Sequence, residues 1–167
     1  MDKIQEMLVK MLKRNKFFEK MSDEQILKFS DLFKLWMSSE WTAIIVEWHI
    51  PEKIYILKRW SLVAKKANWL NSIVLWKIEE WEVFGEMSFF YKKPAMASVV
   101  CKSSTADYWE ISRKDFDIFL KENPEVKTHI MDILTKREKN NKEVLWWSFK
   151  PTVVDKKDDL GDIQINL

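Results

Sequence analysis

The spacing of hydrophobic residues changes twice along the chain. Residues 3–14 place apolar side chains on one helical stripe: Ile4, Met7, Leu8, Met11 and Leu12. From residue 42 the pattern becomes short runs rich in β-branched and aromatic residues, about ten residues apart: TAIIVE, KIYIL, SLVAKK, NSIVLWKI, MASVVCK and TADYWEI. Helical spacing returns in SRKDFDIFLKEN. The order helices, strands, helices predicts a mainly β barrel or sandwich with flanking helices.

Helix-start signals divide the chain. Ser22 with Gln25, and Ser112 with Asp115, have the spacing of capping boxes. Pro124 suits the first position of a further helix. We therefore predict an N-terminal helical segment (1–32), a β-roll (33–111), C-terminal helices (112–138) and a polar, disordered tail (139–167).

Tryptophan stands where a β-protein normally turns. The chain has ten tryptophans and two glycines. Several tryptophans interrupt or precede strand-like runs: Trp41, Trp48, Trp60, Trp69, Trp76 and Trp81. Trp146-Trp147-Ser148 would be a flexible Gly-Gly-Ser linker if both tryptophans were glycine. Hairpin turns favour glycine because their central residues need positive φ, which a residue with a Cβ adopts poorly.

Two interpretations of this pattern remain open. In one, the protein is an aromatic-rich barrel with surface tryptophans. In the other, these eight positions are glycine in the native protein, read from UGA in an alternative, bacterial genetic code and mistranslated as tryptophan. The second leaves only Trp36 and Trp109 and brings glycine to about 6%, near the usual level. Sequencing the gene decides: UGG codons exclude recoding.

Composition excludes several classes of protein. The net charge of +2 gives no clustered basic excess, so we expect no nucleic-acid partner. No apolar run is long enough to span a membrane, and the N-terminus lacks the apolar segment of a signal peptide. Cys101 is the only cysteine. The absence of a disulfide framework fits a cytoplasmic protein.

Residues 33–116 resemble the cyclic nucleotide-binding domain of catabolite-activator-type regulators and protein kinase A regulatory subunits. The matching stretches are Glu40-Trp41, Glu47-Trp48-His49, Tyr55-Ile56-Leu57 through Trp60, and Leu75 through Glu86, with tryptophan at family glycine positions. VFGEMSFF matches the family's phosphate-binding cassette directly. The resemblance extends over about residues 17–135 and implies a jelly-roll (double-stranded β-helix) barrel.

The resemblance implies a cyclic AMP or cyclic GMP site and no bound cofactor or metal. In the family, backbone N–H groups of a short helix face the cyclic phosphate and a glutamate, here Glu86, accepts a hydrogen bond from the ribose 2′-hydroxyl. Gly85 would allow close approach of the backbone. The implied binding residues are Leu75, Phe84, Gly85, Glu86, Met87, Ser88, Ala95, Met96, Ala97 and Ser98.

One position departs from the family pattern. The family usually places a phosphate-binding arginine nine residues after the glutamate, and here that residue is Ala95. Lys92 or Lys93 could supply a substitute cation, with a solvated loop lysine as the alternative. In the last predicted helix, Ile130, Met131 and Leu134 are candidate lid residues over the purine, and packing against the barrel is their alternative role.

Two binding functions follow. The first is a stand-alone regulatory sensor for a cyclic nucleotide or related phosphorylated ligand, without a DNA-binding domain because the last thirty residues show no helix-turn-helix pattern. The second is a degenerate member of the fold that serves as an interaction or dimerisation scaffold. Helices 3–14 and 125–137 are candidate surfaces for a protein partner or homodimer in both. An enzyme is not expected, because His49 and His129 are the only histidines and no catalytic constellation stands out.

Overall fold

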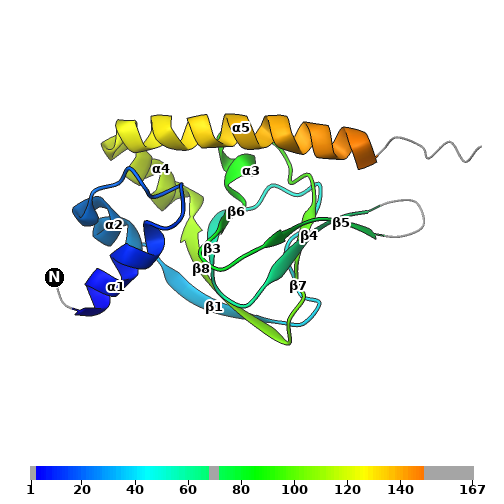
Figure 1. Cartoon of the computed structure of the whole chain (residues 1–167), viewed down its shortest axis with the longest axis horizontal. Coiled ribbons are helices and arrows are strands. Elements are labelled where there is room, and N and C mark those ends of the chain that lie inside the picture. The colour runs from blue at the N-terminus through cyan, green and yellow to red at the C-terminus, as the bar shows by residue number, and fades with distance from the viewer. Residues whose placement is uncertain (1–2, 68–71, 149–167) are drawn as a thin grey trace, which may run out of the picture.

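The computed structural model describes residues 3–67 and 72–148 of the chain. Two helices, α1 (Lys3–Leu12) and α2 (Asp23–Ser30), precede the strands. A short helix, α3 (Glu86–Tyr91), interrupts them, and α4 (Arg113–Glu122) and α5 (Pro124–Ser148) follow. In Figure 1, α1, α2 and α4 gather at one end of the strands, while α5 runs along the top of the molecule above α3.

The strands form two antiparallel sheets of four strands each. One sheet has the order β1 (Lys34–Ser39), β8 (Thr105–Ser112), β3 (Lys53–Arg59) and β6 (Val83–Phe84). The other has the order β2 (Ala43–Ile45), β7 (Ser98–Cys101), β4 (Leu62–Ala67) and β5 (Ser72–Ile78). The strands therefore run from residue 34 to residue 112, and the predicted fold class, mainly β with flanking helices, is confirmed.

A single apolar cluster fills the space between the sheets. Its buried members come from strands of both sheets and from the loop before β7: Ile45, Tyr55, Leu57, Leu62, Ile78, Phe84, Ala95, Val99, Cys101, Ala106 and Tyr108. Because alternate residues of a strand point to opposite faces, this shared cluster requires the sheets to face one another, as in a jelly roll. Cys101 is one of its small buried residues.

The helices enclose a second, aromatic core. Buried phenylalanines from the α1–α2 connection, α2 and α4 meet there, and Phe17 lies 6.5 Å from Phe116 between ring centroids. The capping box of α2 is complete, with Ser22 and Gln25 bonding each other's backbone N–H. At α4, Ser112 Oγ accepts from the Asp115 N–H at 3.1 Å. These caps satisfy backbone N–H groups at the starts of both helices.

Four tryptophans occupy turns in a left-handed backbone conformation. The φ angles are 64° at Trp41, 68° at Trp48, 80° at Trp60 and 71° at Trp81. The first three side chains are 60%, 70% and 51% exposed, whereas Trp81 packs against Trp109 and the helical core. Residues with a Cβ rarely adopt such angles. The prediction of glycine-like turns is confirmed at these four positions, and Trp69 lies outside the described residues.

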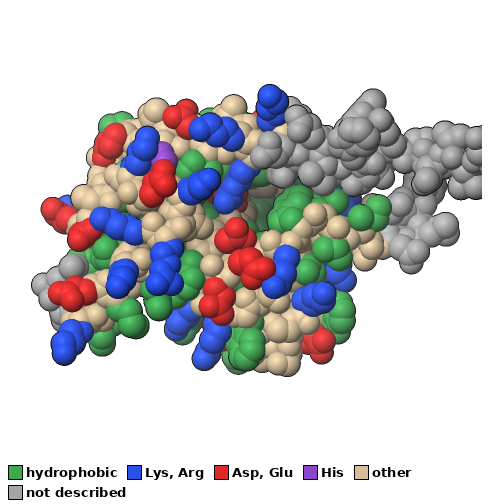
Figure 2. All heavy atoms as spheres, in the orientation of Figure 1, with side chains coloured by type: hydrophobic (Ala, Val, Ile, Leu, Met, Phe, Trp, Pro, Cys, Tyr) green, Lys and Arg blue, Asp and Glu red, His purple; other side chains and the backbone are tan. Residues whose placement is uncertain are grey.

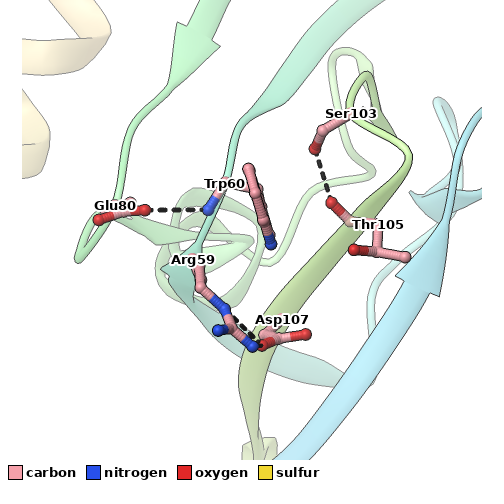
Figure 3. A network of polar contacts seen from close by, with 6 residues as sticks. All are labelled: Arg59, Trp60, Glu80, Ser103, Thr105 and Asp107. Atoms are coloured by element: carbon pink, nitrogen blue, oxygen red, sulfur yellow. Dashed lines mark hydrogen bonds and ion pairs between the residues drawn. The ribbon is translucent and has the colours of Figure 1, made fainter.

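Polar contacts bind the Trp60 turn to its neighbours, as Figure 3 shows. The Trp60 N–H donates to Glu80 Oε1 at 3.0 Å, which ties the β3–β4 turn to the β5–β6 turn. Beside it, Arg59 Nη2 donates to Asp107 Oδ2 at 2.5 Å across β3 and β8. Because the turn is held on both sides, the surrounding fold rather than Trp60 itself imposes the positive φ.

Two tryptophan predictions are wrong. Trp76 lies within β5, paired with Ala64 beside a register shift, so a strand and not a turn accommodates it. Trp146 and Trp147 lie in α5 rather than in a linker.

The helix α5 is longer than predicted. It continues to Ser148, so the prediction of a disordered tail from residue 139 is wrong for residues 139–148. That stretch contains the helix-favouring residues Glu, Lys and Leu and no proline or glycine, which outweighs the weak propensity of its two asparagines. Residues 149–167 lie outside the described part of the chain.

Candidate functional site

A left-handed glycine joins strand β6 to helix α3. Gly85 has φ 82° and occupies the N-cap position of α3. A Cβ on Gly85 would lie 3.1 Å from Ile45 Cδ1, 3.3 Å from Tyr55 Cδ2 and 3.4 Å from the carbonyl oxygen of Lys53. Both the backbone angle and the crowding favour glycine here. The cassette geometry predicted for Gly85, a turn that opens a short helix, is confirmed.

The first residue of α3 carries a buried carboxylate. Glu86 is 4% exposed, and its Oε1 accepts a hydrogen bond from Arg137 Nη1 of α5 at 2.9 Å. Burial raises the pKa of Glu86, and the charge of Arg137 and a hydrogen bond from its own backbone N–H oppose that rise. A carboxylate placed in this way can accept a hydrogen bond from a ligand hydroxyl, provided that α5 gives access to it.

The remaining cassette residues have mainly packing contacts. Phe84 is buried in the roll and its ring stacks on Tyr55 with centroids 5.0 Å apart. Met87 is partly buried against the helical core, and Ser88 is buried with its carbonyl oxygen 3.4 Å from Arg113 Nη2. Leu75 is half-buried in β5. The part of these residues in ligand binding stays a prediction.

The loop before β7 is fastened to the turn between β2 and β3. The Ala95 N–H donates to the His49 carbonyl at 2.9 Å, and the Trp48 N–H donates to the Ala95 carbonyl at 2.9 Å. Ser98 Oγ accepts from the Glu47 N–H at 2.9 Å. Ala95 shares the buried cluster of the roll with Phe84, so the loop and the cassette converge on one interior.

No cation replaces the missing arginine inside this loop. The side chain of Ala95 is a buried methyl group, Ala97 is buried, and Met96 is 37% exposed. The side chains of Lys92 and Lys93 are exposed, and Lys92 has φ 52° at the end of α3. The exposure of both lysines agrees with solvated loop charges rather than with a cation directed into the roll.

The candidate lid residues lie mostly in the helical core. Ile130 and Leu134 are 1% and 0% exposed and belong to the cluster around Phe116, whereas Met131 is half-buried. These positions match their alternative role, packing. The α5 residue that reaches the cassette is Arg137, which sequence reasoning missed. Its only signal is its place about one turn after Leu134, on the same face of the helix.

Two cavities of the described residues lie outside the cassette. One, of about 620 Å³, lies between α2 and α4. The other, of about 300 Å³, is lined partly by Ile45, Lys53 and Tyr55, the residues nearest to Gly85. Glu86 itself is buried and paired with Arg137.

Charge and metal-ligand patterns add no further site. No group of three or more His, Cys, Asp or Glu side chains within the described residues could hold a metal ion. His49 Nδ1 lies 3.1 Å from the Glu47 carbonyl, and His129 Nε2 lies 2.8 Å from the Lys16 carbonyl. Figure 2 shows acidic and basic side chains interspersed over the visible face. Among the helices described, none is long and apolar enough to cross a membrane.

Comparison with solved structures identifies the fold. The regulatory domain of Toxoplasma gondii protein kinase A with cyclic AMP has 20% sequence identity and a TM-score of 0.67 over 81% of this chain and 50% of that chain. The Thermus thermophilus catabolite activator protein has 18% identity and a TM-score of 0.70, over 81% and 64% respectively.

A third structure has the same fold. It is the regulatory subunit of a cyclic AMP-independent protein kinase A from Trypanosoma brucei, with 19% identity and a TM-score of 0.70 over 87% of this chain and 52% of that chain. That subunit is a triple mutant, with one substitution introducing an arginine, and is bound to cyclic AMP in its A site. The present chain thus spans half to two thirds of these proteins.

Comparisons by sequence give no match. No family model matches the chain, and no curated protein matches it.

Proposed function

The chain has the fold of the cyclic nucleotide-binding domains, and we propose that it is a regulatory sensor module whose ligand is a cyclic nucleotide such as cyclic AMP or cyclic GMP. The observation that carries the proposal is the buried carboxylate of Glu86, presented directly after the left-handed Gly85 at the start of α3. A carboxylate that is kept from water is costly unless it has a partner. Arg137 is its partner in this structure, and we propose that Glu86 also accepts a hydrogen bond from the ribose 2′-hydroxyl of a bound ligand.

The missing arginine limits the expected affinity. An arginine at position 95 would contribute a charge-assisted, bidentate contact to the phosphate, and the Ala95 methyl group contributes none. Removing such a contact costs about 1.5–3 kcal/mol, roughly 10- to 150-fold in the dissociation constant. We therefore propose that this module binds its cyclic nucleotide more weakly than a domain that has the arginine.

The scaffold alternative rests on the same residue. Ala95 is the observation that favours a member of the fold without a ligand, and the structural neighbours, which include domains solved with cyclic AMP, give that alternative no support. A protein partner or second copy would find apolar side chains on α1, where Ile4 and Met7 are 74% and 57% exposed. Part of the apolar face predicted for residues 3–14 is therefore accessible to a partner, whereas Val9 and Leu12 are buried in the core.

Thermal unfolding with ligands tests the proposed function. Ligand that binds only the folded protein raises the free energy of unfolding by about 2.7 kcal/mol at one hundred times its dissociation constant. We expect cyclic AMP or cyclic GMP at millimolar concentration to raise the melting temperature of the wild-type protein, and linear AMP to raise it less. The Ala95→Arg variant should respond at lower cyclic nucleotide concentration. No shift in either protein would reject the proposal.

A further inference from the structure

Strand β1 is an edge strand with exposed apolar side chains. It pairs with β8 on one side, and among the described residues no strand pairs with its other side. Leu35, Trp36 and Met37 are 56%, 52% and 68% exposed. Because neighbouring residues of a strand point to opposite faces, both faces of β1 carry uncovered apolar groups. Figure 1 shows β1 along the lower side of the molecule, away from α5.

The other edge strands of the two described sheets are short or irregular. Strand β6 has two residues and β2 has three. The pairing of β5 with β4 contains a register shift between Ala64 and Lys65. By contrast, β1 has six residues and no proline, and it pairs with β8 in unbroken register from Lys34 to Ser39. Short or irregular edges discourage the addition of a further strand, whereas a regular apolar edge is a template for it.

The backbone of β1 can bind one further strand. In an antiparallel pair, alternate residues direct their N–H and C=O groups to the neighbouring strand. The remaining residues of β1 direct theirs away from β8, and an added strand would bond them in the same way. Strand addition would therefore satisfy the backbone groups of the edge and cover its apolar side chains together.

The occupant that fits this edge is a second copy of β1, because the strand is complementary to itself. When two copies pair antiparallel about Met37, Lys34 of each copy lies opposite Glu40 of the other. Both residues are exposed, and opposite charges across neighbouring strands attract. Met37 then lies opposite its own copy on the two-fold axis, and Leu35 lies beside it on the same face.

We propose that the protein forms a homodimer in which β1 pairs antiparallel with β1 of a second copy, with Met37 on the two-fold axis. The four-stranded sheets that contain β1 join into one sheet across the dimer. Strand β6, which leads to Gly85, is at the opposite edge of this sheet, so the dimer does not depend on the proposed ligand.

Sedimentation velocity of the full chain tests for the dimer. We expect the sedimentation coefficient of wild type to rise from the monomer to the dimer value as the protein concentration is raised about a hundredfold. Met37→Thr keeps a strand-favouring side chain but removes an apolar contact from both copies, and it should weaken the dimer about tenfold. Met7→Thr, at a methionine of α1 that is 57% exposed, is the matched control and should dimerise like wild type.

Two charge variants test the register of the pairing. Lys34→Glu and Glu40→Lys each place like charges opposite one another at both ends of the paired strands, and each should weaken self-association about tenfold. An equimolar mixture of the two variants restores opposite charges, but only between different copies. The mixture should therefore form a heterodimer with about the affinity of wild type. Circular dichroism and a cooperative melt establish that each variant folds.

Three results would overturn the proposal. Wild-type protein that stays monomeric at every concentration would exclude a second copy and leave the edge of β1 to a strand of another protein. Loss of the dimer in Met7→Thr but not in Met37→Thr would assign the interface to α1. A mixture of Lys34→Glu and Glu40→Lys that associates no better than either variant alone would exclude the antiparallel register about Met37.

Discussion

Replacing the turn tryptophans with glycine should stabilise the protein. Trp41, Trp48, Trp60 and Trp81 have φ between 64° and 80°. Removing the Cβ of a residue with positive φ lowers the strain of the folded state by about 1–2 kcal/mol. The greater freedom of glycine in the unfolded chain offsets about 0.5–1 kcal/mol of this. The net gain is then about 0.5–1 kcal/mol per turn, or about 1.5–3 kcal/mol for the three exposed residues Trp41, Trp48 and Trp60. Trp81 is left out, because its side chain packs against Trp109 and the helical core.

Two contacts that the tryptophans make reduce this gain. Lys65 Nζ lies 4.7 Å from the Trp41 ring centroid and Lys66 Nζ lies 5.4 Å from that of Trp48. Exposed cation–π pairs contribute about 0.5–1 kcal/mol each. We therefore expect the triple glycine variant at Trp41, Trp48 and Trp60 to gain about 0.5–1 kcal/mol in the free energy of unfolding, measured by urea denaturation with an unchanged slope.

The matched control is Trp36→Gly against Trp60→Gly. The two side chains are 52% and 51% exposed, but Trp36 lies in strand β1 without a positive φ. Trp60→Gly should stabilise, whereas Trp36→Gly should destabilise by about 0.5–1 kcal/mol because glycine weakens a strand. Equal destabilisation by both substitutions would refute the reasoning from backbone angle. Stabilisation at these exposed turns would support the recoding hypothesis, and UGG codons in the gene would exclude it.

Three further predictions concern the cassette. Gly85→Ala should destabilise the protein by about 1–3 kcal/mol in urea unfolding, because a Cβ there has a strained φ and lies 3.1 Å from Ile45 Cδ1. Burial raises the pKa of Glu86 above its usual value of 4.5, so this group binds a proton more readily in the folded than in the unfolded chain. The contribution of Glu86 to stability is therefore fully present below its unfolded pKa and is lost as the pH rises through its folded pKa. Glu86→Gln should remove this loss, which is measured as the urea midpoint from about pH 4 to 7. A pH profile identical to that of wild type would contradict the prediction. Ala95→Arg should tighten cyclic AMP binding at least about tenfold in titration calorimetry, and no change would show that position 95 does not face the phosphate.

The turns could be predicted because their chemistry is local, whereas the cassette was predicted from the family resemblance of VFGEMSFF. A turn residue with positive φ favours glycine in any fold. Tryptophans at positions typical of glycine therefore indicated the turns at Trp41, Trp48, Trp60 and Trp81. Similarly, Ser22 and Gln25 interact within one helical turn, and their capping box follows from spacing alone.

Contacts between distant segments could not be predicted. The Arg137–Glu86 ion pair joins residues 51 positions apart, and its formation depends on how α5 packs across the helical core. Ile130 and Leu134 have the same helical spacing whether they cover a ligand or the core, and only the tertiary structure places them among Phe17 and Phe116. In the same way, α1 buries Val9 and Leu12 while Ile4 and Met7 stay exposed, because α1 contacts the core along only part of its apolar stripe.

The most direct test of the account is calorimetric titration of cyclic AMP and 2′-deoxy cyclic AMP into wild-type protein and the Glu86→Gln variant. The account predicts saturable binding of cyclic AMP to wild type, weakened about tenfold or more both by removal of the ribose 2′-hydroxyl and by the substitution at Glu86, with no further loss when the two changes are combined. Equal affinity of wild type for both nucleotides, or an undiminished affinity in Glu86→Gln, would contradict it.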